Sequence, residues 1–148
     1  MRNLVDEFGH KGFTCLGFPS NQFGHQTNNK AEEVLDQLKY IRPGNGYEPN
    51  FPIFARTDVN GKDALPLFTY LKHKLPVPVG EDGETLMSDP LFLIWSPVAR
   101  NDISWNFEKF LVNKDGIPVK RYSRRYPTMD IKKDIQALLQ NEPVAVEA

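Results

Sequence analysis

The strongest constraint on the fold comes from four polar residues late in the chain, Asn113-Lys114-Asp115-Gly116. They separate two apolar runs, residues 103–112 and 117–122. An Asp-Gly step between such runs is a hairpin signal, because tight turns between strands need a left-handed backbone that glycine adopts freely. We therefore expect an antiparallel pair of strands here, with Trp105 and Asn106 at the start of the first strand.

The earlier part of the chain alternates apolar runs with helical patterns. Residues 13–18 and 51–59 predict buried strands, and residues 30–40 and 65–75 predict helices. Residues 2–8 predict the end of a helix that stops at Gly9. Because strands joined through helices run parallel, the chain is predicted to form a mixed sheet covered by helices on both faces.

Local signals refine the helix predictions. Asn28 or Asn29 is expected to cap the helix at 30–40, Pro66 suits the first turn of the helix at 65–75, and Asp130 is expected to cap a last helix. The inward-facing side chains are predicted to be those at apolar helical spacing, namely Val34, Leu35, Leu38, Ile131, Ile135, Leu138 and Leu139. Residues 141–148 are expected to fray, and residues 76–90 to form a long, irregular loop.

Composition excludes several classes of function. A chain of 148 residues fits one domain, residues 1–148, and its net charge of −1 gives no field that favours nucleic acid or an anionic membrane. No apolar run approaches the roughly 20 residues that span a bilayer, and residues 1–8 do not resemble a signal peptide. One cysteine, Cys15, and three histidines without ligand spacing predict no metal site.

Three side chains are candidates for anion-stabilising chemistry. The indole of Trp105 and the amides of Asn106 and Gln26 bring N–H donors, and Gln26 follows a predicted strand end, where open α/β sheets usually bind ligands. Taken alone, the tryptophan is more simply a core residue and the glutamine an ordinary surface residue. Residue types and spacing leave both alternatives open.

Two segments carry a resemblance to a known family. Phe18-Pro19-Ser20-Asn21-Gln22-Phe23-Gly24-His25-Gln26 is similar to the motif F-P-C-N-Q-F-G-x-Q, and Trp105-Asn106-Phe107-Glu108-Lys109-Phe110 is similar to W-N-F-x-K-F. Both motifs are typical of the glutathione peroxidases. Residues 38–44, 58–61 and 121–125 also match, so the resemblance covers essentially the whole chain.

The resemblance implies a thioredoxin-like α/β fold and the reduction of hydrogen peroxide and organic hydroperoxides by glutathione, in the response to oxidative stress. It implies that Gln26, Trp105 and Asn106 surround a peroxidatic selenocysteine or cysteine. The glutathione carboxylates are expected to bind basic side chains, namely Arg42, Arg124, Arg125 and Lys30. Glutathione is the reducing co-substrate, with no bound cofactor. The closest branch is the cytoplasmic, tetrameric selenoenzyme type, because that branch has a loop like residues 75–90.

The sequence departs from the family pattern in two ways. Ser20 replaces a cysteine and has no redox chemistry, and the first strands and selenocysteine loop of the family would lie before Met1. Cys15 lies in a predicted strand, where a buried thiol has a raised pKa and is inert. We therefore expect a truncated chain that is inactive alone, and one hypothesis is that a UGA selenocysteine codon upstream was read as a stop.

The alternative is a non-catalytic short form that binds glutathione or associates with full-length subunits. A general disulfide oxidoreductase is excluded by the absence of a Cys-x-x-Cys motif.

Overall fold

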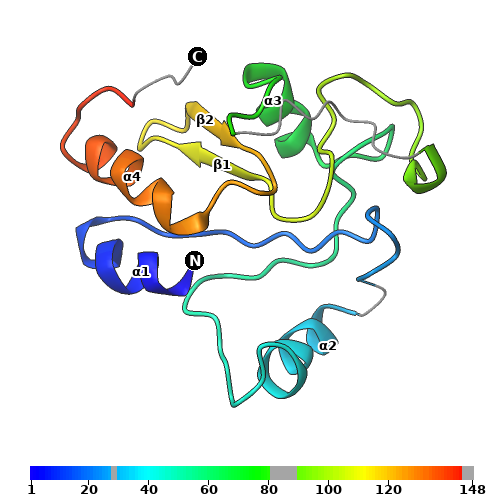
Figure 1. Cartoon of the computed structure of the whole chain (residues 1–148), viewed down its shortest axis with the longest axis horizontal. Coiled ribbons are helices and arrows are strands. Elements are labelled where there is room, and N and C mark those ends of the chain that lie inside the picture. The colour runs from blue at the N-terminus through cyan, green and yellow to red at the C-terminus, as the bar shows by residue number, and fades with distance from the viewer. Residues whose placement is uncertain (28–29, 81–89, 145–148) are drawn as a thin grey trace. The chain divides into compact units, whose positions relative to one another are not determined.

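The computed structural model describes residues 1–27, 30–80 and 90–144. The chain divides into two compact units, the N-terminal unit Met1–Thr57 and the C-terminal unit Asp58–Ala148 (Figure 1). The prediction of a single domain over residues 1–148 stays a prediction.

The N-terminal unit begins with helix α1 (Arg2–Phe8), as the spacing of its apolar residues predicts. The backbone does not stop at Gly9, which has right-handed dihedral angles, but continues in a 3-10 turn, Gly9–Lys11. Gly12, with φ of 97°, is the residue that takes the left-handed conformation. The α-helix itself ends at Phe8 with Gly9 as its C-cap, as predicted, and the left-handed Gly12 ends the 3-10 turn that follows.

The two predicted early strands pair at one point only. Gly17 forms a parallel bridge with Ile53, through bonds from the Gly17 N–H to the Pro52 carbonyl (2.9 Å) and from the Phe54 N–H to the Gly17 carbonyl (2.8 Å). In a parallel ladder the next donors would be the backbone nitrogens of Pro19 in one direction and Pro52 in the other, and proline has no N–H. The prediction of strands over 13–18 and 51–59 is wrong for this reason.

A helix over Ala31–Ile41 confirms the prediction for residues 30–40. It consists of α2 (Ala31–Asp36) followed by one π-helical turn, Gln37–Ile41. Its first backbone donor, the Lys30 N–H, is bound by the Glu33 carboxylate at 3.1 Å, while the predicted caps Asn28 and Asn29 lie outside the described residues. Leu35 is exposed, rather than inward-facing as predicted from its spacing.

The C-terminal unit contains helix α3 (Pro66–Lys74), strands β1 (Lys109–Val112) and β2 (Pro118–Tyr122), and helix α4 (Lys132–Leu139). Short 3-10 turns cover Pro90–Phe92 and Thr128–Ile131. β1 and β2 form the predicted antiparallel hairpin, and Val79 forms a parallel bridge with Tyr122 of β2. The pairing around β2 is therefore mixed, as predicted, although it is small.

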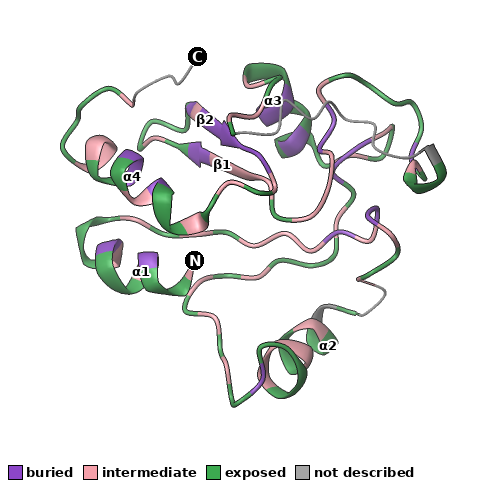
Figure 2. Ribbon diagram, viewed as in Figure 1, coloured by how far each residue is buried: buried purple, intermediate pink, exposed green. Residues whose placement is uncertain are grey.

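Helices contact both faces of this hairpin. Successive side chains of a strand point to opposite faces, and Phe110 lies opposite Arg121 in the ladder. Phe110 packs edge-on against Phe68 of α3, with ring centroids 6.4 Å apart. On the other face, Tyr122 donates a hydrogen bond to Asp134 of α4 (2.7 Å). Burial accordingly concentrates on the strands and on the helix turns that face them (Figure 2).

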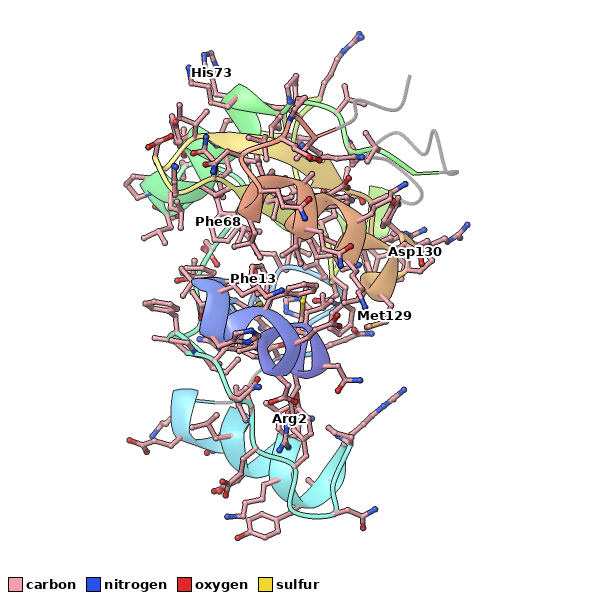
Figure 3. All side chains as sticks on the ribbon, turned by 90° about the vertical axis from the view of Figure 1, so that its left-hand side faces the viewer. Arg2, Phe13, Phe68, His73, Met129 and Asp130 are labelled. Carbon is pink, nitrogen blue, oxygen red and sulfur yellow. The ribbon has the colours of Figure 1, made fainter. Side chains whose placement is uncertain are left out.

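The start of α4 differs from the prediction. Asp130 does not cap the helix but lies inside the 3-10 turn Thr128–Ile131, where its side chain is exposed beside Met129 (Figure 3). The turn begins after Pro127, whose carbonyl accepts the Asp130 N–H at 3.0 Å. Of the predicted core residues, Ile131 and Ile135 are buried, and Leu138 and Leu139 are partly buried.

The end of α4 is closed rather than frayed up to residue 142. The Glu142 N–H bonds back to the Ala137 carbonyl at 2.8 Å, and Asn141 has the left-handed φ of 58° that this closure uses. Residues 145–148, the rest of the predicted frayed tail, lie outside the described residues.

Candidate active site

Trp105 and Asn106 lie in a turn before β1, not in a strand as predicted. The Glu108 carboxylate causes this turn, because one of its oxygens, Oε1, accepts both the Ser104 N–H (2.7 Å) and the Ser104 hydroxyl (2.8 Å). A side chain that binds the backbone four residues earlier replaces ladder bonds with a turn. We call residues 104–108 the donor turn.

The two donor residues are partly buried. The Trp105 ring meets the Phe92 ring edge-on, with centroids 5.6 Å apart and planes at 83°. This contact fixes the indole from the side, while the donor turn fixes its backbone. A donor held in place in this way needs little rearrangement before it can stabilise a developing charge.

A buried ion pair anchors the donor turn to β2. Glu108 Oε2 accepts a hydrogen bond from Arg121 Nε at 2.8 Å, and both side chains are only 1% exposed. The remaining Arg121 donors bind the carbonyls of residues 75, 76, 101 and 102 at 2.9–3.2 Å. One guanidinium thus ties together β2, the end of α3 and the segment that leads into the donor turn.

A second buried cluster holds that leading segment. Asp102 Oδ1 accepts a bond from Lys72 of α3 (2.9 Å), and Oδ2 accepts bonds from the Trp95 indole (2.9 Å) and the Ala99 N–H (2.7 Å). Asn60 completes the cluster by accepting the Ile103 N–H at 2.9 Å. Because these buried groups are mutually hydrogen-bonded, the segment before the donor turn is fixed on both sides.

The hairpin brings Arg124 and Arg125 to the same end of the sheet as the donor turn. Lys109, the first residue of β1, is paired with Tyr122, the last residue of β2. The Lys109 ammonium also donates to the Tyr126 carbonyl at 3.0 Å, and its partial burial lowers the pKa of Lys109. The two arginines therefore follow β2 where Trp105 and Asn106 precede β1.

Gln26 lies in the N-terminal unit, in an exposed loop that follows the turn at residues 21–25. The Asn21 side chain shapes this loop, because its Oδ1 accepts the Thr27 N–H at 3.0 Å. His25 takes a left-handed φ of 52° within the turn. The segment that resembles the family motif therefore forms an ordered turn directly before Gln26.

Lys30 and Arg42 flank the helix Ala31–Ile41 at opposite ends, and both are exposed. Eleven residues of helix separate them by roughly 16 Å along the axis. The two side chains therefore do not form one tight clamp, as a bidentate grip on a single carboxylate would require.

The predicted site residues divide between the units. The hairpin end collects Trp105, Asn106, Arg124 and Arg125, while Gln26, Lys30 and Arg42 belong to the N-terminal unit. Their assembly into one site stays a prediction.

Cys15 is the one thiol of the chain, and it is partly buried. Desolvation by this burial raises the pKa of Cys15, so at neutral pH the sulfur is held as the unreactive thiol. Ser20 is buried as well. Within residues 1–27, 30–80 and 90–144, no group of three or more His, Cys, Asp or Glu side chains could hold a metal ion.

The sequence reasoning missed the residues that position the donor turn, chiefly Glu108, Arg121 and Asp102. A signal was present: two consecutive cations, Lys120 and Arg121, occupy the middle of a short apolar strand. Charged residues are almost never fully buried unless they are paired. Such cations in a core strand therefore predict buried carboxylate partners.

The comparisons with known proteins bear on this arrangement. A family profile described as Glutathione peroxidase matches residues 1–72. Glutathione peroxidase 1 of Rattus norvegicus is 59% identical over 143 residues, which are 97% of this chain and 71% of the relative. The chain belongs to the glutathione peroxidase family. Glutathione peroxidase 1 of Mus musculus is 57% identical over 142 residues, 96% of this chain and 70% of the relative.

Solved structures agree on the fold of this glutathione peroxidase family member. The crystal structure of T. cruzi GPX1 aligns with a TM-score of 0.59 at 29% identity, over 94% of this chain and 68% of that one. The crystal structure of Trgpx in apo form gives the same TM-score at 23% identity, over 96% and 69%. The α/β, thioredoxin-like fold class is thereby confirmed. In the part of the chain that the structure describes, no helix is both long and apolar enough to span a membrane.

Proposed function

We propose that this chain provides the donor and binding side chains for glutathione-dependent reduction of hydrogen peroxide and organic hydroperoxides, in the response to oxidative stress in the cytoplasm. The observation that carries the proposal is the donor turn with Trp105 and Asn106, anchored by the buried Glu108–Arg121 pair, in a chain 59% identical to Glutathione peroxidase 1 of Rattus norvegicus.

The overall reaction consumes one hydroperoxide and two glutathiones, and it yields the alcohol, water and glutathione disulfide. A peroxidatic selenolate or thiolate attacks the terminal peroxide oxygen, the O–O bond breaks, and the alcohol leaves with a proton. Two glutathiones then reduce the selenenic or sulfenic acid. In this scheme Gln26, Trp105 and Asn106 donate hydrogen bonds to the reacting anion.

The glutathione carboxylates are assigned to the basic residues, with Arg124 and Arg125 as the principal pair. A guanidinium can form two parallel bonds with a carboxylate, and the two arginines follow β2 at the end of the hairpin that also carries the donor turn. Arg42 and Lys30 lie at opposite ends of the helix Ala31–Ile41. Each is assigned to a glutathione carboxylate other than the one bound by Arg124 and Arg125, and the two do not bind the same carboxylate together.

The 148 residues on their own are proposed to have no peroxidatic group. The one thiol, Cys15, is partly buried with a raised pKa, and Ser20 has no redox chemistry. The alternative function is a non-catalytic form that binds glutathione or associates with full-length subunits, whose active assembly is proposed to be a tetramer.

The decisive assay measures glutathione oxidation, coupled to NADPH through glutathione reductase, for this chain and for a form extended upstream by a selenocysteine or cysteine segment. We expect turnover from the extended form and background rates from the 148-residue chain. Equal turnover by both would overturn the proposal that the chain has no peroxidatic group, and no turnover by either would overturn the peroxidase function.

The glutathione assignment is tested in the extended form with the double substitution Arg124→Gln and Arg125→Gln. Loss of two charge-assisted contacts is expected to raise the KM for glutathione by about 10-fold to 100-fold. Arg100→Gln, at an exposed arginine outside this end of the hairpin, is the matched control. A KM that changes equally in both variants would contradict the assignment.

A further inference from the structure

Phe107 has a backbone conformation that its side chain does not favour. Its φ is +70°, in the left-handed region. The other described residues with positive φ, apart from glycines, are His25, Asn45 and Asn141, and histidine and asparagine are the side chains that tolerate this region. A bulky aromatic residue there is an outlier, and such outliers concentrate at functional sites.

The surroundings of Phe107 enforce this conformation. Phe107 lies between Ser104 and Glu108, whose side chain accepts both the N–H and the hydroxyl of Ser104. Glu108 is in turn held by Arg121, with both partners 1% exposed. The backbone at position 107 is therefore fixed by buried groups and does not depend on the phenylalanine ring.

The Phe107 ring contributes almost no hydrophobic stabilisation to the fold that could offset this strain. Phe107 is 80% exposed, so it buries little apolar surface. Glycine or asparagine would fit the same backbone with less strain. Neither packing nor backbone preference accounts for a phenylalanine at this position, and this points to a contact with another molecule.

The chemistry of that molecule follows from the neighbours of the ring. Position 107 directly follows Trp105 and Asn106, the donors that the proposed function assigns to the anion that reacts with the peroxide. We propose that Phe107 is a specificity-determining residue whose ring contacts the apolar body of organic hydroperoxides. An apolar ring beside polar donors matches a molecule with an apolar body and a polar O–O end, whereas hydrogen peroxide has no apolar part to contact. This inference rests on the proposed function and deepens it.

The test uses product alcohols, because binding needs no peroxidatic group. The intact chain is titrated with 2-phenyl-2-propanol and with tert-butanol, and the chemical shift of the Trp105 indole N–H is followed by NMR. We expect the aromatic alcohol to bind about fivefold to tenfold more tightly than tert-butanol. Phe107→Gly should abolish this preference, and Phe107→Tyr should keep it.

Tyr40→Ala is the matched control, because Tyr40 is an aromatic residue that is 69% exposed in the other unit. It should leave the preference unchanged. Thermal melting is the second measurement: Phe107→Gly and Phe107→Asn relieve the backbone strain and should melt about 2–4 °C higher than the native chain.

The outcomes separate this inference from the proposed function. An unchanged preference in Phe107→Gly, absence of any preference in the native chain, or a lower melting temperature in both strain-relieving variants overturns the role of Phe107. Loss of turnover in the extended form, together with an intact Phe107-dependent preference, overturns only the peroxidase function. If the extended form turns over cumene hydroperoxide at the same rate with and without Phe107→Gly, only the inference is overturned.

Discussion

The buried pair between Glu108 and Arg121 should be the most sensitive single contact of the C-terminal unit, and Glu108→Gln tests it without changing side-chain shape. The carboxylate accepts two bonds from Ser104 through Oε1 and one from Arg121 through Oε2. A glutamine amide has only one oxygen. Whichever way the amide is oriented, its NH2 group faces an N–H donor, from Arg121 in one orientation and from the Ser104 backbone in the other.

The expected magnitude follows from the burial of both partners. Breaking a buried pair by removing one charge costs about 3–5 kcal/mol, because the other charge stays buried without compensation. Domains of this kind are stable by about 5–15 kcal/mol in total. Glu108→Gln should therefore remove a large part of the free energy of unfolding, measured by urea denaturation with tryptophan fluorescence, since both Trp95 and Trp105 lie in this unit.

Glu48→Gln is the matched control, with the same chemical change in an exposed pair. Glu48 and Lys39 are closer, at 2.6 Å, but the Glu48 side chain is 68% exposed, and solvent screens such pairs. The Lys39 bond lowers the pKa of Glu48, yet we expect Glu48→Gln to leave the unfolding curve, followed by circular dichroism, almost unchanged.

The combination Glu108→Gln with Arg121→Met tests the cause. Removing the buried cation as well should recover part of the lost stability, though not all, because the four carbonyls that Arg121 binds then lose their donor. A loss below about 1 kcal/mol in Glu108→Gln, as for an exposed pair, would refute the reasoning. So would a double variant less stable than Glu108→Gln alone.

Three further measurements probe other features of the chain. Burial raises the pKa of Cys15 above its ordinary value of 9.0. Above about pH 9 the unfolded chain loses this proton while the folded chain keeps it, so the free energy of unfolding should fall as the pH rises from there. Cys15→Ala should remove that fall, as measured by urea titrations at pH 7 and pH 10. Gly61→Ala should destabilise more than Gly116→Ala in thermal melts: both have φ of 79°, but a Cβ at Gly61 would lie 3.0 Å from a backbone carbonyl, whereas nothing lies within 4 Å at Gly116. Tyr122→Phe removes the 2.7 Å bond to Asp134 and should cost about 1.5–3 kcal/mol in urea denaturation; an unchanged midpoint would show that this buried hydroxyl contributes nothing.

Local signals predicted those elements whose cause is local. The hairpin follows from the turn at residues 113–116, and α3 begins at Pro66 as its sequence indicates. Predictions of strands, which depend on pairing between distant segments, were wrong for the early part of the chain. The apolar run 13–18 has a strand composition, but whether it joins a ladder depends on the donors of the segment beside it, and Pro52 lacks one.

The candidate site shows the same division. The side chains Trp105 and Asn106 were predicted from their motif, but the turn that holds them was not. That turn depends on the ion pair that Glu108 forms with Arg121 across the hairpin. The local sequence, Glu108 followed by Lys109, predicts an exposed position for the Glu108 carboxylate instead. A buried charge pair is visible in a sequence only when both partners and the strand register are known.

Pro19 has a consequence for the length of the Gln26 loop. The ladder through Gly17 and Ile53 ends at Pro19, whose carbonyl still accepts the Thr57 N–H at 2.8 Å. Any other residue at position 19 would restore a donor and allow pairing to continue toward the turn at residues 21–25. Pro19 thus sets the point at which strand pairing ends. The segment between position 19 and the helix at Ala31 therefore cannot be shortened by further ladder hydrogen bonds. Substitution at position 19 would change the reach of Gln26 without altering any residue of the loop itself.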